Sequence, residues 1–109
     1  MDFSYWNVIV TESAEQDIDN IIRYLITEKK SKQAAESFLL DFENTIDRLE
    51  NVAGRLEIMD ISGYYERKFR KIRMQKHRYY LIYRIVDDTA RVLRVVHDLQ
   101  DIDKILKSV

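Results

Sequence analysis

The hydrophobic pattern changes its period near Gly54, and this change limits the folds open to the chain more than any other feature. Before Gly54, apolar residues recur every three or four positions, which is the spacing of one face of an α-helix. After Gly63, apolar and polar residues alternate, which is typical of strands in a half-buried sheet. A chain of 109 residues is long enough for one core, so we expect a single domain, residues 1–109, in which helices cover a sheet.

The first half of the chain predicts a short strand followed by two helices. β-Branched and aromatic residues predict a strand over residues 5–10. Ser13 and Gln16 have the pattern of a capping box, so the first helix should begin there. Ser31 predicts the cap of a second helix, and Gly54 lies where a left-handed C-terminal cap would end it. Two helices that are joined by only a few residues should form an antiparallel hairpin.

The second half predicts a loop of about ten residues, three strands and a short terminal helix. The strand-like runs and the terminal helix are expected at residues 69–74, 78–86, 89–96 and 98–106. Asp87 and Asp88 suit a two-residue hairpin turn, and Asp98 and Asp101 are candidate caps of the terminal helix. The expected fold class is therefore α+β. It has an N-terminal strand, an antiparallel two-helix hairpin packed on one face of a mainly antiparallel sheet of about four strands, and a short C-terminal helix.

The opposite face of this sheet should be partly open, and the hairpin register predicts which side chains it carries. With a two-residue turn, Arg84 lies opposite Arg91, and Arg78 lies opposite His97. The open face would then carry Arg78, Tyr80, Ile82, Arg84, Arg91, Leu93, Val95 and His97. Two arginines directly opposite each other are destabilising unless an anion or a carboxylate compensates them.

The charge is distributed unevenly, because residues 1–53 carry net −6, residues 54–84 net +6 and residues 85–109 net −1. The basic segment predicts a surface that binds a phosphate or an acidic partner through Arg70, Arg73, Arg78, Arg84 and Arg91. The alternative is that basic side chains on edge strands prevent aggregation and that their stems cover apolar surface. His97 is either a hydrogen-bonded structural residue or a group for proton transfer near neutral pH.

Composition excludes several kinds of site. The chain has no cysteine and two histidines, so we expect no disulfide, no metal site and no cofactor. No window approaches the roughly 20 apolar residues that cross a bilayer, and the acidic N-terminus does not resemble a signal peptide. We therefore expect a cytoplasmic protein without a membrane partner.

Four segments resemble the RelE/ParE superfamily of type II toxin–antitoxin toxins. They are the strand-to-helix opening, the second helix and the two strands of the last hairpin, at residues 10–25, 34–49, 77–84 and 92–97. The resemblance implies a bacterial growth inhibitor that a cognate antitoxin neutralises, with a toxin–antitoxin hetero-oligomer as one form that the pair can take. We expect an amphipathic antitoxin segment to lie on exposed apolar residues of the helical hairpin or the sheet, with its acidic groups on the basic cluster.

The resemblance leaves the target open, and with it whether the protein is an enzyme. RelE-like members are ribosome-dependent mRNA endonucleases, and ParE-like members poison DNA gyrase. A metal-independent endoribonuclease would use His97 and Tyr80 for proton transfer and Arg73, Arg78 and Arg84 for the phosphate, with Glu57 or Glu66 as another possible base. A net charge of −1 suits docking onto a polyanion poorly, which favours the gyrase target. The third possibility is a degenerate toxin that only binds its antitoxin.

Overall fold

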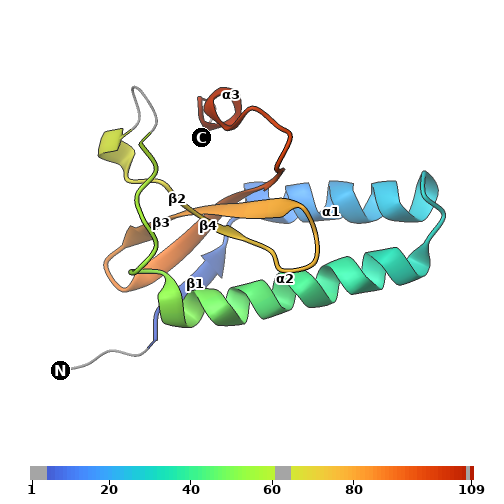
Figure 1. Ribbon diagram of the computed structural model, residues 1–109, viewed down its shortest axis with the longest axis horizontal. Coiled ribbons are helices and arrows are strands. Elements are labelled where there is room, and N and C mark those ends of the chain that lie inside the picture. The colour runs from blue at the N-terminus through green and yellow to red at the C-terminus, as the bar shows by residue number, and fades with distance from the viewer. Residues whose placement is uncertain (1–4, 61–64, 108) are drawn as a thin grey trace.

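The computed structural model describes residues 5–60, 65–107 and 109, and it confirms the α+β fold class. The elements in chain order are β1 (Asn7–Val10), α1 (Glu12–Thr27), α2 (Lys32–Val52), the 3₁₀ turn η1 (Tyr65–Arg67), β2 (Arg70–Arg73), β3 (Tyr79–Val86), β4 (Thr89–His97) and α3 (Ile102–Leu106). The sheet has the order β1-β4-β3-β2. β1 pairs in parallel with β4, and the other pairs are antiparallel. The helical hairpin of α1 and α2 runs along the sheet, and α3 lies apart from this hairpin (Figure 1).

The first helix begins two residues before the expected position. Its N-cap is Thr11, whose side-chain oxygen accepts a hydrogen bond from the backbone N–H of Ala14 at 3.4 Å. The same hydroxyl donates to the carbonyl oxygen of Val92 on β4 at 2.8 Å. The expected start at Ser13 is therefore wrong, because the residue after β1 is already fixed against the sheet and turns directly into the helix. Ser31, by contrast, caps α2 as expected, accepting from the N–H of Ala34 at 3.0 Å.

The second helix ends near Gly54 without a left-handed cap. Ala53, its C-cap, keeps right-handed helical angles, and Gly54 does not adopt the positive φ that we expected. Glycine is required here for space, since a Cβ atom at position 54 would lie 2.6 Å from Cζ2 of Trp6. The Ala53 carbonyl accepts a hydrogen bond of 2.7 Å from the buried hydroxyl of Tyr83, and burial raises the pKa of Tyr83 to about 12 although Arg70 lowers it.

The β3–β4 hairpin has the expected turn but carries a β-bulge. Arg84 lies opposite Arg91, as the two-residue turn predicts. Between Ile82 and Tyr83 the register shifts, so that farther from the turn Tyr79, and not Arg78, pairs with His97. One extra residue in β4 moves every later side chain to the other face of the sheet.

The two faces of the sheet carry separate cores. The helix side is packed around Phe38, Leu49, Leu81, Tyr83, Val92 and Val95. The other side is packed around Phe69, Ile82, Val96 and Leu106. Val95 was expected on the open face and Val96 on the helix side, and the bulge exchanges them. Leu106 of α3 is fully buried, so α3 covers part of the face that we expected to be open. In the described part of the chain, no helix is long and apolar enough to cross a membrane.

Candidate basic surface

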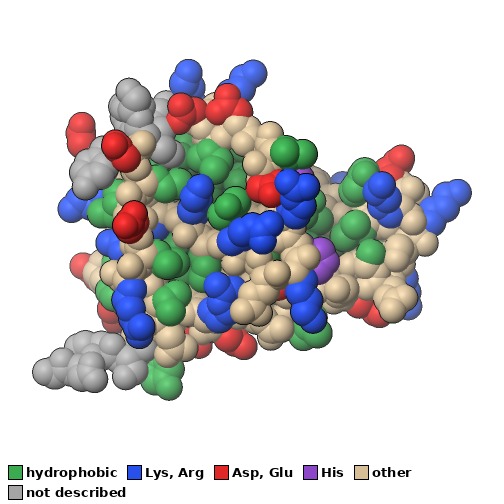
Figure 2. All heavy atoms as spheres, in the orientation of Figure 1, with side chains coloured by type: hydrophobic (Ala, Val, Ile, Leu, Met, Phe, Trp, Pro, Cys, Tyr) green, Lys and Arg blue, Asp and Glu red, His purple; other side chains and the backbone are tan. Residues whose placement is uncertain are grey.

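Basic side chains are spread over the strand-bearing face of the molecule, with hydrophobic side chains between them (Figure 2). The residues predicted to form one site there are divided by the structure into separate groups. Each group has different contacts, and those contacts decide which side chains are available to a partner.

Asp98 brings three of the predicted residues together at the end of β4. Its Oδ2 accepts a hydrogen bond of 2.9 Å from Nε of Arg78, and a guanidinium nitrogen of Arg73 lies 3.8 Å from the same oxygen. Nδ1 of His97 lies 3.3 Å from Oδ1 of Asp98. Asp98 was expected to cap the terminal helix, but Asp101 alone does so, accepting from the N–H of Lys104. We call Arg73, Arg78, His97 and Asp98 the Asp98 cluster.

The ring of His97 is positioned by its neighbours. Nδ1 accepts a hydrogen bond of 3.1 Å from the N–H of Leu99, which assigns the proton of the neutral ring to Nε2. The ring also packs edge-on against Tyr79, at 5.1 Å between centroids. Burial, and then the nearby Tyr24, raise the pKa of Tyr79. Oδ1 of Asp98, which also lies near Nδ1, is buried and has no hydrogen bond within the described residues.

Tyr80 and His97 do not share a face of the sheet, although the expected register placed them together. Tyr80 pairs with Val96 on the side covered by α3, and Nζ of Lys71 lies 4.6 Å from the centre of its ring. His97 pairs with Tyr79 instead. The two groups proposed for proton transfer are therefore separated by the sheet, because neighbouring residues of a strand point to opposite faces.

Two arginines of the strands bind within the protein. One terminal nitrogen of Arg70 donates to the carbonyl oxygens of Ala53, Gly54 and Leu56 at 2.8–3.3 Å. Arg70 thus caps the C-terminal end of α2, where a cation is favourable. Arg94 joins β4 to α1 through a bidentate pair with Asp17, at 2.8 and 3.0 Å. This hydrogen bond raises the pKa of Arg94, although burial opposes it.

Arg84 and Arg91 form a second group, beside the hairpin turn. They are exposed, directly opposite each other and on the side of the sheet that carries α3. They line a cavity of about 290 Å³ with Arg67, Phe69, Val86, Leu93 and Val109. No hydrogen bond or ion pair joins either guanidinium to another described residue.

Asp41 of α2 holds the β2–β3 turn, a role that the sequence did not reveal. The buried carboxylate accepts hydrogen bonds from the backbone N–H groups of Gln75, Lys76 and His77, and Nδ1 of His77 lies 2.7 Å away. Burial alone would raise the pKa of Asp41, but these hydrogen bonds outweigh it and lower the pKa. In the sequence, Asp41 is one of several acidic residues in a long helix. Its spacing does not distinguish it from the acidic residues that are exposed to solvent.

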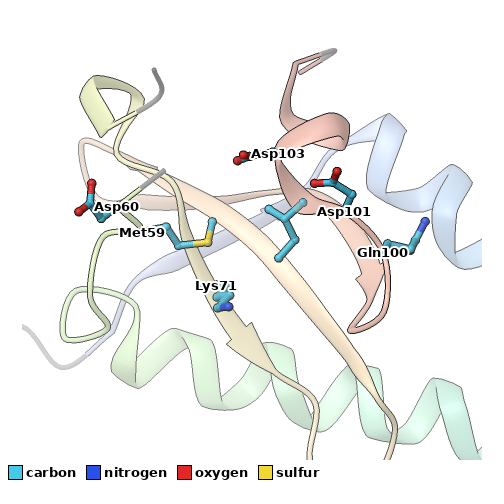
Figure 3. A pocket seen from close by; sticks show the side chains of 7 residues that line it. Met59, Asp60, Lys71, Gln100, Asp101 and Asp103 are labelled. Atoms are coloured by element: carbon cyan, nitrogen blue, oxygen red, sulfur yellow. The ribbon is translucent and has the colours of Figure 1, made fainter. Parts of the chain in front are cut away.

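A larger cavity, of about 480 Å³, opens between α3 and the loop before η1 (Figure 3). Met59 and Asp60 lie on the loop side, Asp101 and Asp103 on the α3 side, and Lys71 of β2 between them. No group of His, Asp and Glu side chains in the described part of the chain is arranged to hold a metal ion.

Known proteins share both the sequence pattern and the fold. The family described as ParE toxin of type II toxin–antitoxin system, parDE, matches residues 8–102. A structure titled as a chromosomal ParDE toxin–antitoxin system from P. aeruginosa is 16% identical, with a TM-score of 0.67, covering 87% of this chain and 98% of that chain. A copper-bound mutant toxin from Helicobacter pylori, also 16% identical, has a TM-score of 0.47 and covers 87% of this chain and 99% of its own. No curated protein shows significant sequence similarity to the chain.

The family match spans most of the chain and includes α1, α2, β2, β3, β4 and all but the first residue of β1. The structural likeness agrees with it at the level of the fold. The chain belongs to the family of ParE toxins of type II toxin–antitoxin systems.

Proposed function

We propose that this ParE-family toxin inhibits bacterial growth by poisoning DNA gyrase in the cytoplasm and that a cognate antitoxin protein neutralises it. Membership of a toxin–antitoxin family supports both parts. The observation that carries the choice of target is the separation of Tyr80 from His97 by the sheet. It argues against Tyr80 and His97 acting together as one acid–base pair, which supports a mechanism based on protein binding.

The proposed contact residues are the exposed arginines, namely Arg73, Arg78, Arg84 and Arg91. Arg70 is excluded from this set, because its guanidinium binds the end of α2. An arginine fork suits carboxylates of a protein partner as well as it suits phosphates. In this mechanism the toxin needs no cofactor.

Supercoiling and cleavage-complex assays with purified gyrase test the proposal. The toxin is expected to block supercoiling and to increase cleaved DNA, while a purified translation system continues to make protein at the control rate. Inhibited translation with unaffected gyrase would overturn the proposed target. Normal growth of cells that express the toxin without antitoxin would overturn the toxic activity and leave a module that only binds its antitoxin.

The Asp98 cluster supports a second candidate, ribosome-dependent cleavage of mRNA. It places the imidazole of His97 beside the guanidinium groups of two exposed arginines. The side chain of Arg73 is 46% exposed, and that of Arg78 is 62% exposed. In this candidate, His97 transfers a proton and the arginines hold the phosphate. The double variant His97→Ala with Arg73→Ala should then abolish ribosome-dependent cleavage. Full cleavage by this variant would exclude the assignment.

A further inference from the structure

One row of side chains crosses the open end of the sheet, on the face away from the helical hairpin. Ile9 of β1 pairs with Arg91 of β4, and Arg91 pairs with Arg84 of β3. The β2–β3 register, in which Arg70 pairs with Tyr83, places Phe69 next to Arg84 when it is extended by one residue. The row therefore reads apolar, cationic, cationic, apolar across the sheet. We call these four residues the arginine row.

The two guanidinium groups of the row lack a compensating charge. Arg84 and Arg91 are exposed, and no described residue forms an ion pair with either. Like charges directly opposite on neighbouring strands destabilise a sheet. An arrangement of this kind is relieved by an anion from outside the chain.

The surroundings of the row define which anion fits. Its cavity of about 290 Å³ is lined by three arginines and four apolar residues, and no Asp or Glu side chain of the described residues lines it. Arg67, the third arginine, donates to a backbone oxygen of Val109 at 2.9 Å, so the proposal uses Arg84 and Arg91 alone. Ile9 is 50% exposed and Val86 is 39% exposed, so apolar surface lies open beside the cations. The neighbouring part of the same face is closed, because Leu106 of α3 packs there on Ile82 and Val96.

We propose that the arginine row binds an acidic peptide segment of a protein partner, with carboxylates on Arg84 and Arg91 and an apolar side chain in the cavity between them. The inference deepens the proposed function and rests on it, since it gives the chemistry by which a partner protein is held. Bidentate binding of carboxylates by arginine supplies the specificity, and aliphatic walls accept the apolar side chain.

A nucleic acid fits the row less well than a peptide. Single-stranded nucleic acids bind to basic grooves in which aromatic side chains stack on the bases. The aromatic residue of the row, Phe69, is only 2% exposed, and the other apolar walls of the cavity are aliphatic. Two cations directly opposite each other also match two carboxylates of one peptide better than a long run of phosphates.

A nuclear magnetic resonance titration of the isotope-labelled toxin with synthetic peptides tests the inference. The probe is a peptide with Asp-Leu-Asp between Gly-Ser flanks, and the matched peptides carry Asn-Leu-Asn and Asp-Ser-Asp. The acidic–apolar peptide is expected to bind at least tenfold more tightly than the Asn peptide and several-fold more tightly than the Ser peptide. The shifted resonances should lie between Arg84 and Arg91 and around Ile9.

The double variant Arg84→Glu with Arg91→Glu should bind the peptide at least tenfold more weakly. The control variant Arg23→Glu with Lys32→Glu makes the same change in charge at two exposed helix positions and should bind within twofold of the wild type. Arg84→Gln with Arg91→Gln replaces the first variant if the glutamates prevent folding. Equal loss in the control, or equal binding of all three peptides, would contradict the inference.

A 12-nucleotide single-stranded RNA forms the competing arm of the experiment. Tighter binding of the RNA than of the acidic peptide, lost in the Arg84/Arg91 variant, would identify a nucleic-acid site and overturn the inference. The gyrase assay of the wild-type toxin separates the two proposals. A toxin that inhibits gyrase and fails to bind the peptide overturns only the inference, whereas one that binds the peptide and leaves gyrase unaffected overturns only the proposed function.

Discussion

At the scale of single residues, Asp41 fixes the turn between β2 and β3. Its carboxylate accepts three backbone N–H groups of the turn between β2 and β3 and also contacts His77. The turn precedes Arg78, so the same contact helps to place the Asp98 cluster. A buried carboxylate is tolerated here because each of its oxygens has a donor.

We predict that Asp41→Asn lowers the free energy of unfolding by about 2 kcal/mol, the magnitude for losing hydrogen bonds to a buried charged group. Asparagine keeps only one side-chain oxygen as an acceptor. Its amide nitrogen, itself a donor, would face the N–H donors that the second carboxylate oxygen now accepts. Urea unfolding measures the change. Asp47→Asn, at an exposed position of the same helix, is the matched control and should shift the free energy of unfolding by less than about 0.5 kcal/mol.

The lowered pKa of Asp41 also predicts how this stabilisation depends on pH. The unfolded chain binds a proton near the ordinary value of 3.8, and the folded protein binds it only at lower pH. The stabilisation is therefore complete above pH 3.8 and is lost as the pH falls through the folded pKa. The difference in unfolding free energy between the wild type and Asp41→Asn should shrink as the pH falls below 3.8. A difference that grows as the pH falls below this value would contradict the assignment.

At the scale of elements, the close packing of Trp6 on Gly54 joins β1 to the end of α2. The backbone N–H of Trp6 also donates to the carbonyl oxygen of Glu50 at 2.7 Å. Since Gly54 does not require a positive φ, alanine at this position should act through the indole ring alone.

Gly54→Ala is predicted to displace the Trp6 ring into water and to lower the free energy of unfolding by roughly 1–3 kcal/mol, the range for overpacking. Trp6 is the single tryptophan of the chain, so its fluorescence emission should shift to longer wavelength. In the double variant Gly54→Ala with Trp6→Leu, the smaller side chain leaves room for the added methyl group. Destabilisation that persists at full size in this background would show that the backbone, and not the ring, is responsible.

Substitution of Leu106 tests whether α3 packs on the sheet. Leu106→Ala should reduce the unfolding free energy by roughly 2–5 kcal/mol, because a fully buried leucine is truncated in the cluster with Phe69 and Ile82. Leu99→Ala is the control, since Leu99 is 77% exposed. Equal and small effects of both substitutions in thermal unfolding would mean that α3 does not close this face.

Periodicity predicted the order of these elements but not the register of the hairpin beyond the turn. Alternation locates strands, and the Asp87–Asp88 turn correctly set Arg84 opposite Arg91. The bulge left no sign in the alternation, because Val95 and Val96 are both apolar and either fits a core. The resulting shift separated Tyr80 from His97. The contacts of Asp98 with Arg73, Arg78 and His97 were not predicted either. An aspartate shortly before a helix has the pattern of an N-cap, and the sequence therefore indicated that role for Asp98.

At the scale of the whole molecule, the cations are divided between internal and external contacts. Arg70 and Arg94 bind backbone carbonyls and Asp17, and Asp98 partly neutralises Arg73 and Arg78. The acidic first half of the chain, at net −6, forms the helical hairpin on the other side of the sheet. The surface that faces a partner is thus less basic than the net +6 of residues 54–84 indicates.

We therefore predict weak binding of the toxin alone to nucleic acid, with a shallow dependence on salt. If single-stranded RNA is held through Arg84 and Arg91 alone, it should release about two counterions, for a slope of log K against log salt near −1.5. Fluorescence anisotropy with a labelled 12-nucleotide RNA between 50 and 300 mM salt measures it. A slope near −4 or steeper would require roughly six phosphate contacts, more than these two arginines supply, and would favour the RNA-cleaving candidate.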